Sequence, residues 1–372
     1  MKIAVLKENK KENRIGLIPH DIKTLLSTNE IYVEKSVKNI DKYISAGAKM
    51  FNKYDILTSC DVIIKLSPLT NKQAKYIKKP EQLIITNSYL ANNPMYLKLL
   101  LKKRLTSIGL ELIHEKGAYY FLMTNEQIKG KFGVILAGYY LSALSCKFAK
   151  GKAIANIHGI KNKTNYLIIN YSYAAYEAIK VILSLGGNVT ILENNKEYVD
   201  LLKNDKIIHE LIKNNDADFA IKESQFDILM DETKKTDVLI NTTTVPGENT
   251  HLKITSEMIR SIPDGGVYID LGADQGFSSE VFKKPNTIKK PYTIYHNKIC
   301  IAFENIPSFF ANTMSEAISE VIAKIIHTIE KDGTMLSNIK NNHLISQALQ
   351  TFNGDLTNDT IARALNLKFK KL

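Results

Sequence analysis

Short apolar runs alternate with helical patterns in two separate series along this chain of 372 residues, and that alternation restricts the fold more than any other feature. It is typical of parallel sheets that carry helices on their faces. In the first series, residues 2–6, 62–66 and 83–86 are strand candidates, and residues 96–105 have a helical pattern. A long apolar helix is predicted over residues 125–149. The strand candidates of the second series are residues 166–169, 189–192, 238–240, 267–269 and 299–302.

The chain becomes helical again from Asn312, where apolar residues recur at helical spacing as far as Ile329. The residues that follow are too few for a third core, so we expect them to pack on the first body. The sequence therefore predicts two doubly wound α/β domains, the second inserted in a discontinuous first one. The predicted boundaries are 1–125 with 307–372 for the first domain and 126–306 for the second.

The composition argues against several classes of protein. With 44% hydrophobic and 24% charged residues, the chain resembles ordinary globular proteins and not disordered ones. The net charge of +12 would suit a nucleic-acid partner, but only four of the 50 basic residues are arginines and the lysines are scattered. We therefore predict no nucleic-acid partner, and the charge would suit small anionic molecules.

The location and the metal content are also constrained. Cys60, Cys146 and Cys300 lack the spacing of zinc ligands or of a disulfide framework, so no metal is predicted. The N-terminus lacks the apolar core of a secretory signal, and the longest apolar run, 132–146, is shorter than a usual membrane span. We expect a soluble cytoplasmic protein without a membrane partner.

The turn after the first strand of the second series reads Asn170-Tyr-Ser-Tyr-Ala-Ala175. Dinucleotide-binding domains have a glycine-rich turn here, because a bare backbone lets the pyrophosphate approach the helix N-terminus. An acidic residue about 20 positions on holds the ribose, and Glu193 is placed to do so. Asn170 can adopt the left-handed conformation of a glycine, but Ser172 crowds the phosphate. On the turn alone, a plain strand-turn-helix unit is favoured over a cofactor site.

Short motifs follow one another in order over nearly the whole chain. They are Lys7-Glu8 with Glu12-Asn-Arg-Ile-Gly-Leu-Ile-Pro19, Asp61-Val-Ile-Ile-Lys-Leu66, Val238-Leu-Ile-Asn-Thr-Thr-Thr-Val-Pro-Gly247, Ile269-Asp-Leu-Gly-Ala-Asp-Gln-Gly276 and Glu304-Asn-Ile-Pro307. In this order the motifs resemble those of the alanine dehydrogenase and nicotinamide nucleotide transhydrogenase (alpha subunit) family, of which the chain would be a divergent member. The resemblance implies two Rossmann-like domains, with the inserted domain binding the cofactor and the discontinuous domain binding the substrate.

The resemblance implies that Arg14 and Lys65 hold the carboxylate and the oxo or amino end of a small amino-acid substrate. The residue types suit that role, since a guanidinium presents a planar fork to a carboxylate and an ammonium can polarise a carbonyl. A lysine that closes an apolar strand must reach water or meet an anion. Without the family, Arg14 would be interpreted as a solvated surface arginine and Lys65 equally as an ordinary strand-end lysine.

The resemblance also assigns residues to the cofactor. It implies that Asp274 lines the nicotinamide and substrate pocket as a catalytic residue, that Asn305 lies near the nicotinamide, and that Val245 shapes a loop over the nicotinamide ribose. The alternatives are a helix N-cap or loop aspartate, a turn-forming asparagine and a type II turn. The remaining predicted cofactor-binding residues are Asn170, Ser172, Tyr173, Ala174 and Glu193.

One departure from the family falls on its catalytic histidine, where this chain reads Ser88-Tyr-Leu-Ala91. A phenol has a pKa near ~10 and an imidazole near ~6.5, so tyrosine is the poorer base at neutral pH. It can still donate a hydrogen bond to a carbonyl. We therefore predict that Tyr89 and Asp274 handle protons and polarise the reaction intermediate. The second departure is the glycine-poor turn described above.

The function predicted from these residues is that of an NAD-dependent amino-acid dehydrogenase acting on a small L-amino acid such as alanine. Hydride would leave the Cα for the nicotinamide, and water would convert the imine to a 2-oxo acid, or the reverse. Two alternatives stay open: an opine- or saccharopine-type dehydrogenase with a larger amine donor, and a catalytically degenerate binding or regulatory protein. The resemblance implies a homo-oligomer, a dimer or a hexamer. We expect the long helix from Asn125 to provide a contact surface.

Overall fold

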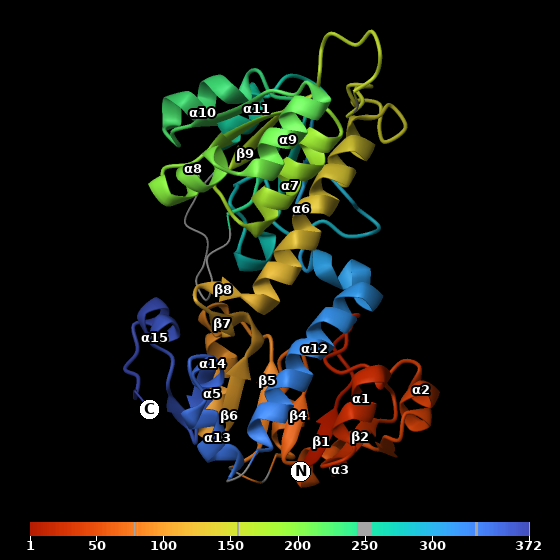
Figure 1. Ribbon diagram of the computed structural model, residues 1–372, viewed down its shortest axis with the longest axis vertical. Coiled ribbons are helices and arrows are strands. Elements are labelled where there is room, and N and C mark those ends of the chain that lie inside the picture. The colour runs from red at the N-terminus through yellow and green to blue at the C-terminus, as the bar shows by residue number, and fades with distance from the viewer. Residues whose placement is uncertain (78, 80, 155, 244–253, 332–333, 372) are drawn as a thin grey trace. The chain divides into compact units, whose positions relative to one another are not determined.

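The chain forms two compact α/β units in a computed structural model (Figure 1). The structure describes residues 1–77, 79, 81–154, 156–243, 254–331 and 334–371. Of these, residues 1–124 and 307–371 belong to unit 1, and residues 125–243 and 254–306 belong to unit 2. Unit 1 is therefore built from two separate parts of the sequence.

A mostly parallel sheet forms the centre of unit 1. Within the described residues its strands follow the order β17-β16-β6-β5-β4-β1-β2-β3. Strands β1 to β6 pair in parallel, and β1 lies between β2 and β4, so the strand order reverses there. The strands are β1 (Lys2–Val5), β2 (Glu30–Glu34), β3 (Lys49–Phe51), β4 (Val62–Ile64), β5 (Leu83–Thr86), β6 (Thr106–Gly109), β16 (Leu349–Phe352) and β17 (Asp355–Leu356).

The C-terminal part of the chain completes unit 1. The helix α12 (Ala311–Ile329), the long blue helix of Figure 1, buries Ile318, Ile322 and Ile326 in the same core as the strands. Strand β16 then pairs antiparallel with β6, which confirms that the last residues pack on the first body. The other helices are α1 (Pro19–Leu25), α2 (Ile40–Ser45), α3 (Lys53–Ser59), α4 (Asn71–Ala74), α5 (Pro94–Lys102), α13 (Met335–Asn341), α14 (His343–Ser346) and α15 (Asp359–Leu365), with the 3-10 turns η1 (Leu90–Asn92) and η2 (Leu110–Leu112).

Unit 2 repeats this arrangement with a second sheet, in the order β11-β10-β9-β12-β13-β15-β14 among the described residues. All pairs are parallel except that of β14 and β15, and β9 lies between β10 and β12 at the reversal of strand order. The strands are β9 (Asn165–Ile169), β10 (Asn188–Leu192), β11 (Phe219–Lys222), β12 (Val238–Asn241), β13 (Val267–Asp270), β14 (Thr293–Tyr295) and β15 (Lys298–Ile301). The predicted fold class, two doubly wound α/β domains, is confirmed.

The long helix of the second series differs from its prediction. The helix α6 spans Tyr120–Leu141 and not 125–149. It ends early because Ser142 donates to the carbonyl of Tyr139 at 2.7 Å and Ser145 to that of Tyr140 at 3.0 Å, which satisfies carbonyls of the last turn. The other elements are β7 (His114–Glu115), β8 (Ala118–Tyr119), α7 (Tyr173–Ser184), α8 (Lys196–Lys203), α9 (Lys206–Asn215), α10 (Phe226–Thr233), α11 (Ser256–Ser261), η3 (Ala273–Gln275) and η4 (Ile306–Phe310).

No helix among the described residues combines the length and the apolar character that crossing a bilayer would require.

Helix α6 approaches the start of α7 at a glycine. A Cβ atom on Gly130 would lie 2.9 Å from the carbonyl carbon and 3.0 Å from the Cα of Ala174, and it would overlap the carbonyl oxygen. These are backbone atoms that cannot swing aside. The absence of a side chain at Gly130 therefore sets how closely α6 packs on the first turn of α7.

We expect Gly130→Ala to lower the free energy of unfolding by about 1–3 kcal/mol through overpacking, although alanine favours a helix by ~1 kcal/mol over glycine. Urea denaturation measures the difference. Gly133→Ala on the same helix is the matched control, because its Cβ would meet only the ends of the Leu271 side chain, at 3.2 and 3.3 Å. Equal stability of the two variants would contradict the assigned contact.

Candidate active site

Two opposite charges are buried together at the carboxyl ends of β1 and β4 in unit 1. Glu8 follows β1 and Lys65 follows β4, the two strands at which the strand order reverses. In doubly wound sheets this is where ligands bind, since the loops on either side of the reversal leave toward opposite faces. Lys65 therefore lies where a ligand of unit 1 is expected.

The Lys65 side chain is completely buried. Its Nζ donates to Asn9 Oδ1 at 3.1 Å, to Ser67 O at 3.0 Å and to Ser67 Oγ at 2.5 Å, and it lies 3.7 Å from Glu8 Oε2. An ammonium has three N–H donors, so protein acceptors already occupy all of them. A substrate oxygen would have to replace one of these acceptors.

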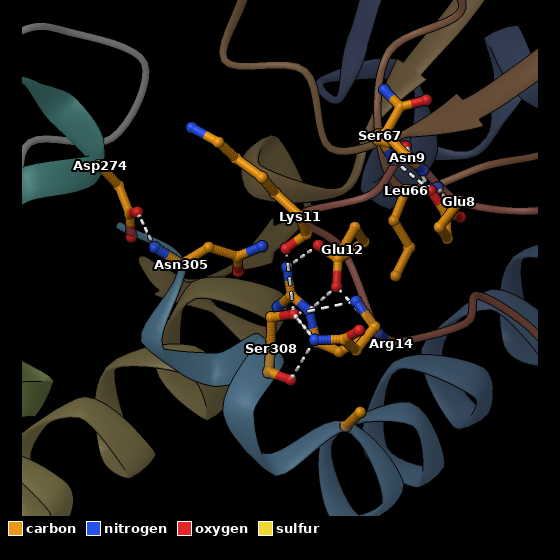
Figure 2. A network of polar contacts seen from close by, with 12 residues as sticks. Glu8, Asn9, Lys11, Glu12, Arg14, Leu66, Ser67, Asp274, Asn305 and Ser308 are labelled. Carbon is orange, nitrogen blue, oxygen red and sulfur yellow. Dashed lines mark hydrogen bonds and ion pairs between the residues drawn. The ribbon is translucent and has the colours of Figure 1, made fainter. Parts of the chain in front are cut away.

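Glu8 is held from the other side of the pair. Its carboxylate accepts from the backbone N–H of Leu66 at 2.7 Å and from that of Ser67 at 2.8 Å (Figure 2). Burial raises the pKa of Glu8 and lowers the pKa of Lys65, and the attraction between the two charges opposes both shifts. Removal of either partner would leave the other as an uncompensated buried charge.

Arg14 is buried as well, with 2% of its surface exposed, so the interpretation as a solvated surface arginine is wrong. Its Nε donates to Glu12 Oε1 at 2.8 Å and its Nη2 to Glu12 Oε2 at 2.7 Å (Figure 2), and its Cζ lies 5.8 Å from the centre of the Phe121 ring. Glu12 therefore takes one edge of the guanidinium.

The segment that carries Arg14 has no regular secondary structure and is fixed by α12. The backbone N–H groups of Ile15 and Ile18 donate to the hydroxyls of Ser315 and Ser319, at 2.9 and 3.0 Å. The two serines lie one turn apart on α12, so their hydroxyls satisfy successive donors of an extended segment. A Cβ on Gly16 would overlap Ile64 of β4, which shows how closely this segment lies against the sheet.

Tyr89 precedes η1 in a left-handed backbone conformation, with φ 42° and ψ 60°. That conformation is uncommon for a bulky side chain and needs support from its surroundings. The backbone N–H of Tyr89 donates to Glu111 Oε1 at 2.9 Å, and the side chain is half-buried against the core of unit 1. Its predicted catalytic role stays a prediction.

Glu111, on η2, is 1% exposed. Its Oε1 accepts a second hydrogen bond from Gln350 Nε2 at 2.8 Å, whereas its Oε2 is buried and has no hydrogen-bond partner among the described residues. Burial raises the pKa of Glu111 to about 7, against the opposing effect of these hydrogen bonds. An acid that titrates near neutrality therefore lies directly behind the backbone of Tyr89.

In unit 2, Asn170 follows β9 at the reversal of strand order, with φ +61°. It adopts the left-handed conformation that a glycine usually provides. Its Nδ2 donates to Thr243 Oγ1 at 3.2 Å and its carbonyl accepts from Thr242 Oγ1 at 2.8 Å. Both threonines follow β12, so the neighbouring strand holds the turn.

Helix α7 starts directly after this turn, with Ser172 as its N-cap residue. Ser172 Oγ accepts from the backbone N–H of Ala175 at 3.1 Å, so the side chain folds back on the helix. Tyr173 is half-buried, and Ala174 and Ala175 are completely buried. The two alanines provide the small side chains that a close contact between helix and strand requires.

Glu193 follows β10 and is 8% exposed. Its Oε2 accepts from the backbone N–H of Tyr171 at 2.6 Å, and its Oε1 accepts from those of Asn194 and Asn195 at 2.8 and 2.7 Å. The Tyr171 ring contacts the Tyr198 ring at a centroid distance of 4.8 Å. Glu193 thus joins the end of β10 to the turn after β9. Its contact with a ribose stays a prediction.

Asp274, on η3, and Asn305 are brought together in unit 2. Asp274 Oδ1 accepts from the backbone N–H of Asn305 (Figure 2), and its Oδ2 lies 2.9 Å from Nζ of Lys129 on α6. Lys129 is buried and also lies 2.9 Å from Glu126 Oε1. Two oxygens of one carboxylate are therefore fixed by different elements. The predicted cofactor residue Val245 lies outside the described residues.

Three polar residues of these sites were missed in the sequence. They are Glu111, Gln350 and Lys129, all of them nearly or completely buried. Glu111 had a local signal, because it interrupts the apolar run Leu110-Glu-Leu-Ile113. Gln350 had none, since its partners are distant in sequence. Lys129 lies three residues after Glu126 on the same helix, but its contact with Asp274 is distant in sequence.

The comparisons with known proteins cover nearly the whole chain. Residues 4–125 match the model of the alanine dehydrogenase/PNT N-terminal domain, and residues 133–359 match that of the C-terminal domain. The chain belongs to the alanine dehydrogenase/PNT family. The predicted resemblance is confirmed, including its spread over both units.

Individual relatives agree with this assignment. The chain is 26% identical to an alanine dehydrogenase of Staphylococcus saprophyticus, over 99% of this chain and 98% of that protein. It is also 26% identical to one of Methanococcus maripaludis, with the same coverage. Among solved structures, an L-alanine dehydrogenase superposes with a TM-score of 0.84 at 20% identity over 98% of this chain and 99% of that one. A transhydrogenase from Sinorhizobium meliloti superposes with a TM-score of 0.76 at 18% identity over 96% and 100% of the two chains.

The titration of Glu111 predicts a pH dependence of stability. Because its pKa is higher in the folded chain than its ordinary value, the folded state binds the proton more tightly, and this stabilisation is complete below about pH 4.5. It is lost as the pH rises through about 7. We expect the free energy of unfolding of the native chain, relative to Glu111→Gln, to fall by about 2–3 kcal/mol between pH 5 and 8.

Urea denaturation of both proteins across this pH range measures the difference. Glu115→Gln is the control, because this exposed carboxylate bonds only a tyrosine hydroxyl in the described contacts. A constant difference between the native chain and Glu111→Gln would contradict the raised pKa.

Proposed function

We propose that this protein is an NAD-dependent amino-acid dehydrogenase that interconverts a small L-amino acid and its 2-oxo acid. The observation that carries the proposal is the completely buried Lys65, with Glu8 beside it, at the strand reversal of unit 1. An ammonium in that position is expensive to bury and is suited to polarise a carbonyl or to meet an anion. The names of the family's members support the reaction class.

The substrate would be bound by residues of unit 1. Its carboxylate would pair with the Arg14 guanidinium, which Glu12 holds in a fixed plane. Its oxo or amino end would replace one of the acceptors of Lys65, most simply the Ser67 hydroxyl, which can rotate to another partner. The charge of Lys65 then favours the electron density that collects on a carbonyl oxygen.

Proton handling is assigned to Tyr89 and Asp274. The Tyr89 phenol would donate a hydrogen bond to the carbonyl or imine, which needs no change in its ionisation at neutral pH. Asp274 would orient the reacting group through a carboxylate that Lys129 and Asn305 hold in place. Bound NAD supplies the acceptor for the hydride that leaves the Cα.

The residues after β9 fit a dinucleotide with a hydroxyl in place of a glycine. Ser172 Oγ accepts from Ala175 N–H, which leaves its own O–H to donate to a phosphate oxygen. Asn170 supplies the left-handed turn, and the N-terminus of α7 favours an anion. The Glu193 carboxylate would accept from the ribose hydroxyls and would repel a 2′-phosphate.

A second candidate function is a binding protein without turnover. It is favoured by one observation: the donors of Lys65 and one edge of Arg14 are already paired within the chain. Such a site could bind an amino or oxo acid weakly and respond to it.

Cofactor binding provides the first test. We expect calorimetry to show saturable binding of NADH, tighter than that of NADPH because of charge repulsion by Glu193. In Glu193→Gln the preference for NADH should fall by roughly tenfold, which corresponds to about 1.4 kcal/mol. Glu197→Gln, an exposed carboxylate on α8, is the control. Absence of NADH binding at millimolar concentration would rule out the dehydrogenase.

The second test separates the candidate functions by their amine donor. With NADH and a 2-oxo acid, oxidation that depends on ammonia supports the proposed reaction, and oxidation that requires an amino acid supports an opine-type dehydrogenase. Binding of NADH without oxidation by either donor supports the binding protein. In Arg14→Lys we expect KM for the 2-oxo acid to rise roughly tenfold or more, because the bidentate contact with the carboxylate is lost.

A further inference from the structure

A cluster of buried polar side chains lies behind Tyr89 in unit 1. Gln350 Oε1 accepts from Ser107 Oγ at 3.0 Å, and Gln350 Nε2 lies 2.9 Å from Ser88 Oγ and 2.8 Å from Glu111 Oε1. All four side chains are at most 5% exposed. Polar groups are costly to bury without partners, and these four side chains hydrogen-bond one another.

The cluster acts on the backbone of Tyr89. Glu111 Oε1 accepts from the Tyr89 N–H, and the Tyr89 carbonyl accepts from the N–H of Asn92 at 2.8 Å. The left-handed backbone conformation is unfavourable for a tyrosine, so contacts with the surrounding residues must stabilise it. The carboxylate offers a strong acceptor at the point where the chain enters this conformation.

We propose that Glu111, oriented by Gln350, is a positioning residue that holds Tyr89 in its left-handed conformation and so sets where its phenol lies. The inference deepens the proposed function and rests on it for the role of the phenol. It extends the site to the C-terminal strand β16, which carries Gln350. Glu111 itself contacts no reacting atom in this scheme.

The route from β16 to Glu111 depends on a glycine of β6. A Cβ atom on Gly109 would lie 2.8 Å from Cδ of Gln350 and would overlap its amide nitrogen. Only a residue without a side chain leaves the Gln350 amide room to reach the carboxylate. The pairing of β16 with β6 therefore supplies both the glutamine and its path.

The protonation of Glu111 changes the charge of this contact without changing its partners. Oε1 accepts two hydrogen bonds and Oε2 is unpartnered among the described residues, so the proton can reside on Oε2. The groups that face Glu111 are Gln350 on β16, Ser88 with the backbone of Tyr89, and Tyr96 on α5. The pKa of Tyr96 is raised mainly by burial, and the charge of Glu111 raises it further. The charged form binds the Tyr89 N–H more strongly than the neutral form.

Fluorine NMR of the full chain labelled with 3-fluorotyrosine tests the proposal without any need for turnover. The resonance that disappears in Tyr89→Phe belongs to Tyr89. We expect it to shift with a midpoint near pH 7 in the native chain and to lose this shift in Glu111→Gln. In Glu115→Gln, the control, the shift should be as in the native chain. A Tyr89 resonance that does not move in the native chain, or that titrates unchanged in Glu111→Gln, would overturn the proposal.

A second variant covers the case in which Glu111→Gln does not fold. Gln350→Met removes a donor to the carboxylate, so the midpoint of the Tyr89 shift should move to higher pH. An unchanged midpoint would overturn the proposal.

A measurement of activity distinguishes this proposal from the proposed function. If the chain oxidises NADH, Glu111→Gln should flatten the pH profile of kcat near neutrality, and this effect should vanish in the Tyr89→Phe background. An effect of the same size in both backgrounds would show that Glu111 does not act through Tyr89. If the chain has no turnover but the fluorine resonance behaves as expected, the proposed function fails and the positioning of Tyr89 stands.

Discussion

The burial of the Lys65 ammonium is the constraint on which unit 1 depends. A charge with no exposed surface needs acceptors within the core, and Glu8, Asn9 and Ser67 supply them. These residues follow β1 and β4, so the charge fixes the loops on both sides of the strand reversal. These acceptors hold the Lys65 ammonium in one position, which suits a function that depends on orientation.

In unit 2 the turn after β9 contains no glycine, and hydrogen bonds from neighbouring segments stabilise it. Asn170 adopts the left-handed conformation because two threonines after β12 bind it, and Glu193 accepts from Tyr171 N–H in the same turn. The conformation that glycine makes available locally is here enforced by hydrogen bonds from neighbouring strands. A left-handed residue can therefore stand at this turn without a glycine.

In both units a backbone or side chain is fixed by a buried charged group. Glu111 acts on Tyr89, Lys129 on Asp274, and Glu12 on Arg14. In each case the second group lies behind the residue that the family resemblance singles out. Buried charges are costly, and their use at several predicted site residues supports a common role in fixing those residues.

The sequence by itself determined the alternation of strands and helices, and its motifs were sufficient to identify the family and to select Arg14, Lys65 and Asp274 as candidates. It did not predict β3, whose residues are all exposed, nor β2, β6, β11 and β16. It also did not predict the true end of α6, where two serine hydroxyls bind carbonyls. The hydrogen-bond partners of the buried polar side chains were decided only by the tertiary structure. Gln350 and Glu111 are 239 residues apart, and no local pattern records a contact that forms when β16 pairs with β6. Periodicity reports which face of an element is apolar, whereas the pairing of buried polar groups depends on which elements become neighbours.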